Sequence, residues 1–300
     1  MDKLVKLSPI AKSYIWGGQY FQQFGKSDLD VVSELWELAV RDNEQCLIVS
    51  GIDQGKTLKE VIRDSDIGEN GKSFPYFPLL IKLIDAKENL SVQVHPSDDY
   101  ALKKENSFGK CEMWYIIDAD EGSGLYVGLN KDYTKNEIKE KLNNGTLLDA
   151  LNFFKVKQGD YFVINPGTIH AIGKGVRLLE IQQNSDLTYR LFDYNRLDKN
   201  GLPRELHIEK SLDVIDLCQF KQSKNDSPLL AKNKYFTVKK EFIKGELTIE
   251  ADPFSFKCFT FVEGEGMVDD VPYKRFDTFF LKSGSECRIK GKGIVIISSI

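Results

Sequence analysis

Apolar and polar residues alternate from Asn89 to His95 in the stretch NLSVQVHPSDDY, residues 89–100. Ser91, Gln93 and His95 take every second position there, and leucine and valine residues stand between them. Successive side chains of a β-strand point to opposite faces of its sheet. The pattern therefore predicts a strand with one aliphatic face and one face that carries a hydroxyl, an amide and an imidazole.

Short strand-like runs recur along most of the chain. Residues 74–95 read as two runs joined by the turn-like DAKEN, and a third run, CEMWYIID, begins at Cys111. Between Asp132 and Phe154 apolar residues instead recur at every third or fourth position, which predicts a small helical insert over about residues 132–154. Strand-like runs with glycine turns then return. This pattern predicts a mainly β protein built as a barrel or sandwich, not a parallel α/β sheet.

Two β-barrel units are expected. The stretches GDYFVINPG and FDTFFLKSG each run from an aspartate through aromatic and aliphatic residues to a turn, as an internal repeat would. The polar, lysine-rich stretch KQSKNDSP, residues 221–228, is the expected linker. We therefore divide the chain into a first unit over residues 1–220 and a C-terminal unit over residues 229–300, which contains no histidine.

Composition and charge narrow the class of protein. The formal net charge is -4, from 45 acidic and 41 basic residues mixed along the sequence, so no basic stripe is available for nucleic acid. No window approaches the ~18 apolar residues of a membrane span, and the first residues lack an unbroken apolar run. The five cysteines are scattered without C-x-x-C spacing, which predicts free thiols. We expect a cytoplasmic protein that binds neither nucleic acid nor membrane.

Four polar residues have the chemistry of a metal site. Gln93 and His95 share a strand face, and His170 ends GDYFVINPGTIH, where a Pro-Gly turn follows a strand. Glu112 is flanked by apolar and aromatic residues, and a buried carboxylate needs a positive partner or a metal. Two imidazoles and a carboxylate suit zinc, with iron, manganese or cobalt as alternatives. Alternation places Cys111 on the opposite face, as a packing residue.

Four blocks of the sequence resemble the type I mannose-6-phosphate isomerases (phosphomannose isomerases), especially their short form in low-GC Gram-positive bacteria. The blocks are FPLLIKLIDAKENLSVQVHPSDDYA, GKCEMWYII, NPGTIHAIGKG and EIQQNSDLTYRLFDYNR, and the similarity runs from Ser13 to Ile215. The resemblance implies a cupin fold with two jelly-roll barrel units and a small helical insert. It also implies one zinc ion per chain, bound by Gln93, His95, Glu112 and His170.

The same resemblance implies further site residues. It marks Arg190 as the catalytic arginine and Lys110, beside the Glu112 ligand, as a second catalytic candidate. Lys82 and Ser91 are expected near the sugar phosphate, and Trp16 is expected in the pocket. The C-terminal unit is expected to be structural, because without histidine it has no equivalent metal site. A small sugar phosphate is the expected partner, and the expected assembly is a monomer or homodimer.

The implied reaction interconverts mannose 6-phosphate and fructose 6-phosphate through a cis-enediol. A metal ion and the guanidinium of Arg190 both suit the stabilisation of negative charge on oxygen. The proton-transferring base is open between Lys110, a metal-bound water and an acid such as Glu180. Two other functions remain alternatives: an Fe(II) cupin oxygenase and a non-catalytic sugar-phosphate-binding cupin.

Three residues stand apart from this pattern. Cys111 replaces a small residue or proline before the Glu112 ligand, and Ile172 stands where longer family members carry a tyrosine. The third histidine, His207, lies in the helix-like segment RELHIEKSLDVIDL, with acidic residues on either side, which predicts a helix-surface or interdomain contact.

Overall fold

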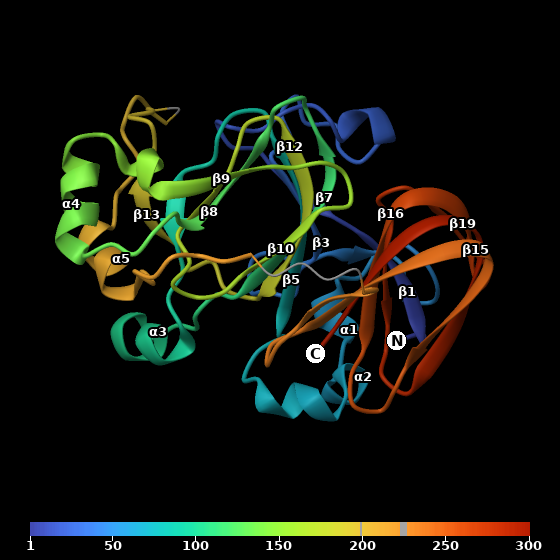
Figure 1. Ribbon diagram of the computed structural model, residues 1–300. Helices are drawn as coiled ribbons and strands as arrows, with labels where there is room; N and C mark the ends of the chain where they lie inside the picture. Colours follow the sequence, from blue (N-terminus) through green and yellow to red (C-terminus); the bar gives the residue numbers. More distant parts are fainter. Residues whose placement is uncertain (199, 223–226) are drawn as a thin grey trace.

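The computed structural model describes residues 1–198, 200–222 and 227–300. The fold is mainly β, as the sequence pattern predicted, and its strands form three sheets in which every ladder is antiparallel. In Figure 1 the strands form two rounded units that lie side by side, with the green and yellow strands in one and the orange and red strands in the other.

The first unit contains two sheets that face one another. One sheet has the order β10 (Tyr161–Ile164), β7 (Glu112–Ala119), β12 (Val176–Gln183), β5 (Leu79–Ala86), β3 (Glu34–Leu38) and β2 (Ile10–Lys12). The other has the order β13 (Tyr189–Phe192), β6 (Val92–Val94), β11 (His170–Ile172), β8 (Gly124–Leu129) and β9 (Leu151–Lys155). Buried Trp114, Val127 and Ile172 pack in one cluster between these two sheets.

The third sheet has eight strands and contains the C-terminal part of the chain. Its order is β14 (Leu229–Lys232), β15 (Thr237–Ala251), β19 (Ser285–Ser299), β16 (Lys257–Val268), β18 (Thr278–Leu281), β1 (Leu4–Ser8) and β4 (Leu47–Ile48), and β17 (Val271–Lys274) pairs with β16. The blue strand β1 therefore lies in the red unit (Figure 1). Phe256 and Phe280 of this unit share a buried cluster with Leu79 and Ile81 of β5, which joins the two units.

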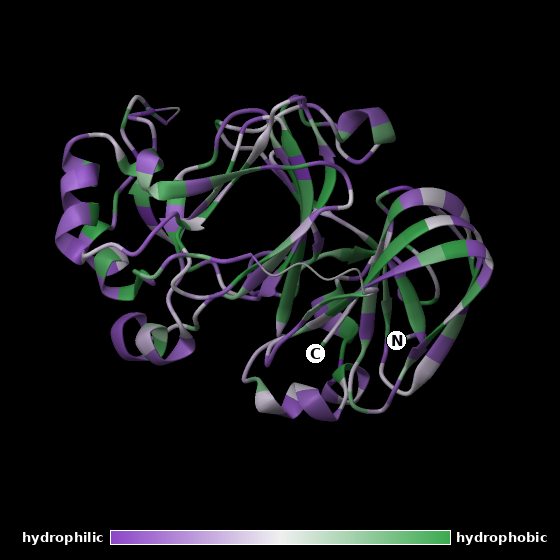
Figure 2. Cartoon of the chain, viewed as in Figure 1, coloured by the Kyte–Doolittle hydropathy of each residue, from purple (hydrophilic) through white to green (hydrophobic). Residues whose placement is uncertain are grey.

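Helices are few and short. They are α1 (Leu58–Val61), α2 (Asp64–Ile67), α3 (Asp98–Glu105), α4 (Lys135–Asn143) and α5 (Ile208–Val214), with 3-10 turns at η1 (Gln22–Phe24), η2 (Glu69–Ser73) and η3 (Leu147–Ala150). Figure 2 shows hydrophobic residues on the strands and a largely hydrophilic surface on α4. Within the described ranges, no helix has both the length and the apolar character to cross a bilayer.

The helical pattern over residues 132–154 yields α4 in its first half only. Thr134 caps α4 by accepting a hydrogen bond from the Glu137 backbone, and the Glu137 side chain accepts one from Thr134 in return. Residues 151–155 form strand β9 instead, paired with β8. The apolar run LNFF fits a strand as well as a helix, and pairing with β8 decides between them.

Candidate metal centre and adjoining cleft

The predicted alternation is present in β6, where Val92 and Val94 are buried together on the aliphatic side. The prediction was wrong for Leu90, which precedes β6, packs in the cluster between the two sheets and lines the cleft with Ser91 and Gln93. Gln93 lies opposite His170 in the pairing of β6 with β11, and opposite Arg190 in the pairing of β6 with β13. Three polar residues from three neighbouring strands therefore form one row across the sheet.

Glu112 reaches the same point from the facing sheet. It is the first residue of β7, where Glu112 and Trp114 share a face and Cys111 and Met113 share the other. Cys111 and Met113 belong to the cluster that joins the two units, so Cys111 is a packing residue, as predicted. All five cysteines are free thiols, which was also predicted.

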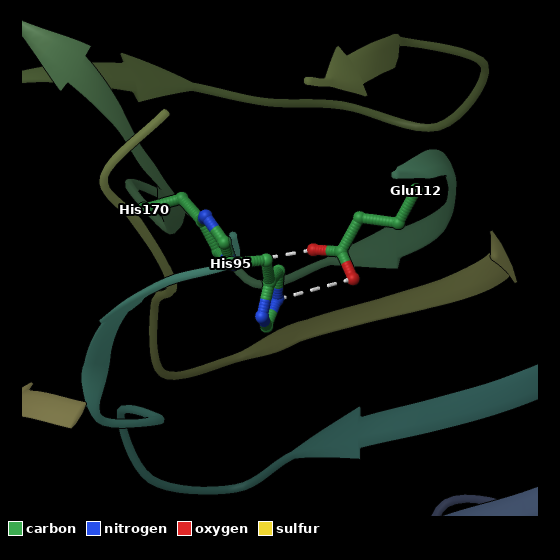
Figure 3. Close-up of side chains that lie close together, drawn as sticks. All are labelled: His95, Glu112 and His170. Carbon is green, nitrogen blue, oxygen red and sulfur yellow. Dashed lines mark ion pairs between the residues drawn. The ribbon is translucent and has the colours of Figure 1, made fainter. Parts of the chain in front are cut away.

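His95, Glu112 and His170 converge, and their possible ligand atoms all lie within 4.8 Å of one another. The Nε2 atom of His170 lies 3.2 Å from Glu112 Oε1, and that of His95 lies 3.5 Å from Oε2. Figure 3 shows the Glu112 carboxylate directed at the two imidazole rings. In the described part of the chain this is the single group of three or more such residues. The amide of Gln93 lies 3.3 Å from His170 Nε2 and adds a fourth polar group.

Both imidazoles use Nδ1 for a backbone hydrogen bond and turn Nε2 toward the Glu112 carboxylate. His95 Nδ1 donates to the Leu187 carbonyl at 3.0 Å, and His170 Nδ1 donates to the Thr168 carbonyl at 2.8 Å. Such bonds to carbonyls fix the tautomer in which Nε2 carries a lone pair. Among described residues, His95 Nε2 and both oxygens of Glu112 are buried without a hydrogen-bond partner.

Burial and charge set the protonation states of this group. Burial, together with the positive charge of Lys110, lowers the pKa of His95 to about 4, although Glu112 opposes this shift. Burial also lowers the pKa of His170. Burial alone would raise the pKa of Glu112, but Lys110 and His95 outweigh it and hold that pKa well below its ordinary value. Two neutral imidazoles and one ionised carboxylate form a donor set that fits zinc.

A cleft of about 360 Å³ adjoins this group. Six of the nine predicted site residues line it: Trp16, Lys82, Ser91, Gln93, Lys110 and Arg190. The other three, His95, Glu112 and His170, are buried beside it. The structure thus brings all nine predicted residues together.

The lysines and the arginine of the cleft have defined partners. Lys110 Nζ lies 2.9 Å from Glu112 Oε2. Lys82 Nζ lies 3.2 Å from Glu180 Oε2 and 3.6 Å from Glu34 Oε2. Burial lowers the pKa of Lys82, but these two carboxylates outweigh burial and raise it above its ordinary value. Arg190 Nε donates to Ser91 Oγ at 3.2 Å, which fixes the guanidinium beside the Gln93 row.

His207 and Arg204 are among the residues of the cleft wall that the sequence did not identify as site residues. His207 was expected to make a helix-surface or interdomain contact, but it directly precedes α5 and its Nδ1 accepts a hydrogen bond from the Arg190 backbone at 3.2 Å. Its own backbone N–H donates to the Arg190 carbonyl at 2.7 Å. The signal was the scarcity of histidine, since all three histidines of the chain lie at or beside this site.

Comparisons with known proteins agree with this geometry. The sequence model for the type I phosphomannose isomerase catalytic domain matches residues 4–137. The chain is 36% identical to mannose-6-phosphate isomerase ManA of Bacillus subtilis over 308 residues, which covers 97% of each protein. A crystal structure of the mannose 6-phosphate isomerase from Bacillus subtilis superimposes with a TM-score of 0.90 at 35% identity, over 99% of both chains. A mannose 6-phosphate isomerase structure bound with zinc and yttrium shares the fold, with a TM-score of 0.76 at 16% identity over 99% of both chains.

Proposed function

Because the chain belongs to the type I phosphomannose isomerase family, we propose that it interconverts mannose 6-phosphate and fructose 6-phosphate with one bound zinc ion. Family membership favours this reaction over an Fe(II) oxygenase and over a non-catalytic sugar-phosphate-binding protein. The observation that carries the zinc proposal is the convergence of His95, Glu112 and His170, with buried ligand atoms that lack hydrogen-bond partners.

The proposed zinc ligands are Gln93, His95, Glu112 and His170. Zinc bound there supplies Lewis-acid stabilisation of the negative charge that develops on a substrate oxygen. The protein prepares the ligands, because the two Nδ1–H groups are held by the carbonyls of Leu187 and Thr168.

Arg190 and Lys110 are the proposed catalytic residues. Arg190 uses Nε and Nη1 for Ser91 Oγ and the Glu205 carbonyl, which leaves Nη2 to donate to a substrate oxygen in the cleft. Arginine stays protonated at working pH, so it supplies a fixed donor where negative charge develops. Lys110 lines the cleft and contacts Glu112, so its positive charge lies between the substrate cleft and a proposed metal ligand. The reaction moves a proton between C2 and C1 through a cis-enediol.

Trp16, Lys82 and Ser91 are the proposed substrate-binding residues. Trp16 is buried and stacks on Tyr14, with ring centroids 5.6 Å apart, which offers a rigid apolar wall to the sugar. The unit expected over residues 1–220 is the proposed catalytic unit, without β1 and β4, which lie in the C-terminal sheet. The C-terminal unit, residues 229–300, is proposed to be structural, because it contributes no residue to the metal group.

We further propose a cytoplasmic location, supported by five free thiols, which are typical of a reducing compartment. The expected assembly, a monomer or a homodimer, stays a prediction.

A coupled assay tests the reaction. Zinc-loaded protein is supplied with mannose 6-phosphate, and fructose 6-phosphate formation is coupled to NADPH production. We expect turnover with the native chain and none with Glu112→Gln, which keeps the side-chain shape and removes the charge. A native chain that contains zinc and produces no fructose 6-phosphate would refute the proposed reaction.

A further inference from the structure

A short segment, Gly109, Lys110 and Cys111, leads directly into β7 and its first residue, Glu112. The course of this segment sets the position of two side chains of the site, the proposed catalytic Lys110 and the proposed ligand Glu112. The backbone N–H groups of all three residues have acceptors in other segments. The middle one, that of Lys110, donates to the Pro96 carbonyl at 3.1 Å.

Two linked side chains accept the other two hydrogen bonds. The Gly109 N–H donates to Asp98 Oδ1 at 3.0 Å, and the Cys111 N–H donates to Gln183 Oε1 at 2.8 Å. Gln183 Nε2 in turn donates to Asp98 Oδ1 at 3.1 Å. Asp98 and Gln183 therefore hold the backbone on both sides of Lys110 as one connected group.

The segment also lies in close contact with the start of α3, of which Asp98 is the first residue. A Cβ atom added at Gly109 would lie 2.5 Å from the Pro96 carbonyl oxygen and 2.6 Å from the Asp98 nitrogen, so only glycine fits there. His95 precedes Pro96, and Glu112 follows Cys111. Two proposed ligands are therefore carried by two segments that touch.

The C-terminal unit reaches Asp98 through the turn between β14 and β15. Tyr235 Oη donates to Asp98 Oδ2 at 2.7 Å, and Lys234 Nζ lies 3.7 Å from the same oxygen. Tyr235 is buried, and its ring belongs to the cluster that joins the two units. Asp98 thus accepts hydrogen bonds from the first unit with one oxygen and from the C-terminal unit with the other.

Asn233 fixes this turn and gives it a second contact with the segment. Its Oδ1 accepts from the backbone N–H groups of Tyr235 at 2.8 Å and Phe236 at 3.0 Å. Its Nδ2 donates to the Cys111 sulfur at 3.5 Å. The turn therefore contacts the segment directly at Cys111 and indirectly through Asp98.

Packing between the two units does not require the Tyr235 hydroxyl. A phenylalanine ring would fill the same space in the buried cluster. The hydroxyl is bonded instead to a carboxylate, and a hydrogen bond to a charged group is stronger than one between neutral groups. What the hydroxyl contributes is therefore a fixed position for Asp98, and through Asp98 a fixed position for Gly109.

We propose that Tyr235 of the C-terminal unit is a positioning residue for the isomerase reaction, which acts through Asp98 to hold Lys110 and Glu112 in place beside the cleft. This inference rests on the proposed isomerase function and deepens it. The C-terminal unit supplies no metal ligand but fixes the segment that carries one. A displacement of about 1 Å in a catalytic group can lower a rate by roughly 10²-fold, so small shifts of this segment affect the reaction.

The test compares Tyr235→Phe with Tyr273→Phe, at temperatures well below the unfolding of either variant. Tyr273 is a buried tyrosine of the same unit whose hydroxyl donates to a backbone carbonyl of β19 at 3.4 Å. We expect Tyr235→Phe to lower kcat by about three- to tenfold and to change KM by less than about twofold. The proposed substrate-binding residues Trp16, Lys82 and Ser91 lie on other segments, which is why KM is retained. Tyr273→Phe should keep native kcat and KM, and equal losses of kcat in the two variants would overturn the proposal.

A double-mutant cycle tests the route through Asp98. Asp98→Ala removes the carboxylate that accepts from both Tyr235 and Gly109, so we expect kcat to fall by about tenfold or more. In the Asp98→Ala background, Tyr235→Phe should change kcat by less than about twofold, because the two residues act as one unit. The same loss from Tyr235→Phe in both backgrounds would contradict this route.

A metal-binding measurement separates this inference from the proposed reaction. Zinc affinity is measured by competition with a chelator for the native chain and each variant, with no turnover required. We expect it to fall by about threefold in Tyr235→Phe and about tenfold or more in Asp98→Ala, because the same segment holds Glu112. Such losses support the positioning role even if the native chain fails to isomerise mannose 6-phosphate. Native kcat and native zinc affinity in Tyr235→Phe would overturn the proposal and leave the isomerase function intact.

Discussion

Gln93 lies directly opposite His170 where β6 pairs with β11, and its amide is 3.3 Å from His170 Nε2. Neighbouring strands lie about 4.8 Å apart, so residues opposite one another on one face can share a small ligand. Arg190 lies opposite Gln93 on the other side. The pairing of three strands thus places two proposed metal ligands and the proposed catalytic arginine in one line.

Gln93→Ala should weaken zinc binding while leaving the fold intact. The variant loses one of four proposed ligands but keeps His95, Glu112 and His170, so we expect zinc affinity to fall by about tenfold or more. Competition with a chelator measures the change. Gln45→Ala, at a partly exposed glutamine whose amide donates to the Asp42 carbonyl, is the control. Native zinc affinity in Gln93→Ala would remove Gln93 from the ligand set.

Arg190→Ala should lose activity and retain zinc. The guanidinium is proposed to stabilise charge in the reaction, and loss of one such donor costs on the order of 10²–10³ in kcat. Ser91→Ala should cost less, because it removes only the hydroxyl that accepts from Arg190 Nε. Steady-state kinetics and zinc content are measured on the same preparations. Normal turnover by Arg190→Ala would contradict the assignment.

Lys82→Met should destabilise the protein. Lys82 is buried against Glu34 and Glu180, and its removal leaves two buried carboxylates without their cation. Breaking a buried ion pair in this way costs about 3–5 kcal/mol. Urea unfolding measures the loss, with exposed Lys59→Met as the control, at a lysine paired with exposed Asp42. An unchanged free energy of unfolding would show that the Lys82 charge is not needed for stability.

The sequence was sufficient to predict the strand pattern, the chemistry of the ligands and the packing role of Cys111. Alternation around Gln93 and the apolar neighbours of Glu112 depend on local rules that hold in any sheet. The row of Gln93, His170 and Arg190 could not be predicted, because strand order and register depend on contacts between distant segments. The place of Arg204 in the cleft wall was missed for the same reason.

The local sequence pattern also could not predict the sheet to which β1 belongs. β1 pairs with β18 through Leu4–Leu281 and three further residue pairs, although the two strands lie at opposite ends of the chain. Its alternation fits either unit, and only the free edge of β18 selects the partner.

Stability should depend on pH through Glu37. Glu37 is fully buried, neither of its oxygens has a hydrogen-bond partner among the described residues, and it faces Lys26, Asp277 and Thr278. Burial raises its pKa from 4.5 to about 7, although Lys26 opposes this. The folded chain therefore holds a proton that the unfolded chain releases, so this contribution to stability is full below pH 4.5 and is lost as pH rises through 7.

Glu37→Gln removes this dependence. At about 1.4 kcal/mol for each pH unit between the two pKa values, the native glutamate costs on the order of 3 kcal/mol at pH 8. We expect Glu37→Gln to be more stable than the native chain at pH 8, and this advantage to shrink at pH 5. Urea unfolding at both pH values measures the difference. An advantage of the same size at pH 5 and pH 8 would contradict the raised pKa.

The binding of one zinc ion by Gln93, His95, Glu112 and His170 is the central claim. Diffraction data collected on either side of the zinc absorption edge, from crystals of zinc-loaded protein, test it most directly. We predict one anomalous peak per chain, at coordinating distance from the two Nε2 atoms and the Glu112 carboxylate. A peak at the protein surface, with none among these side chains, would contradict the account.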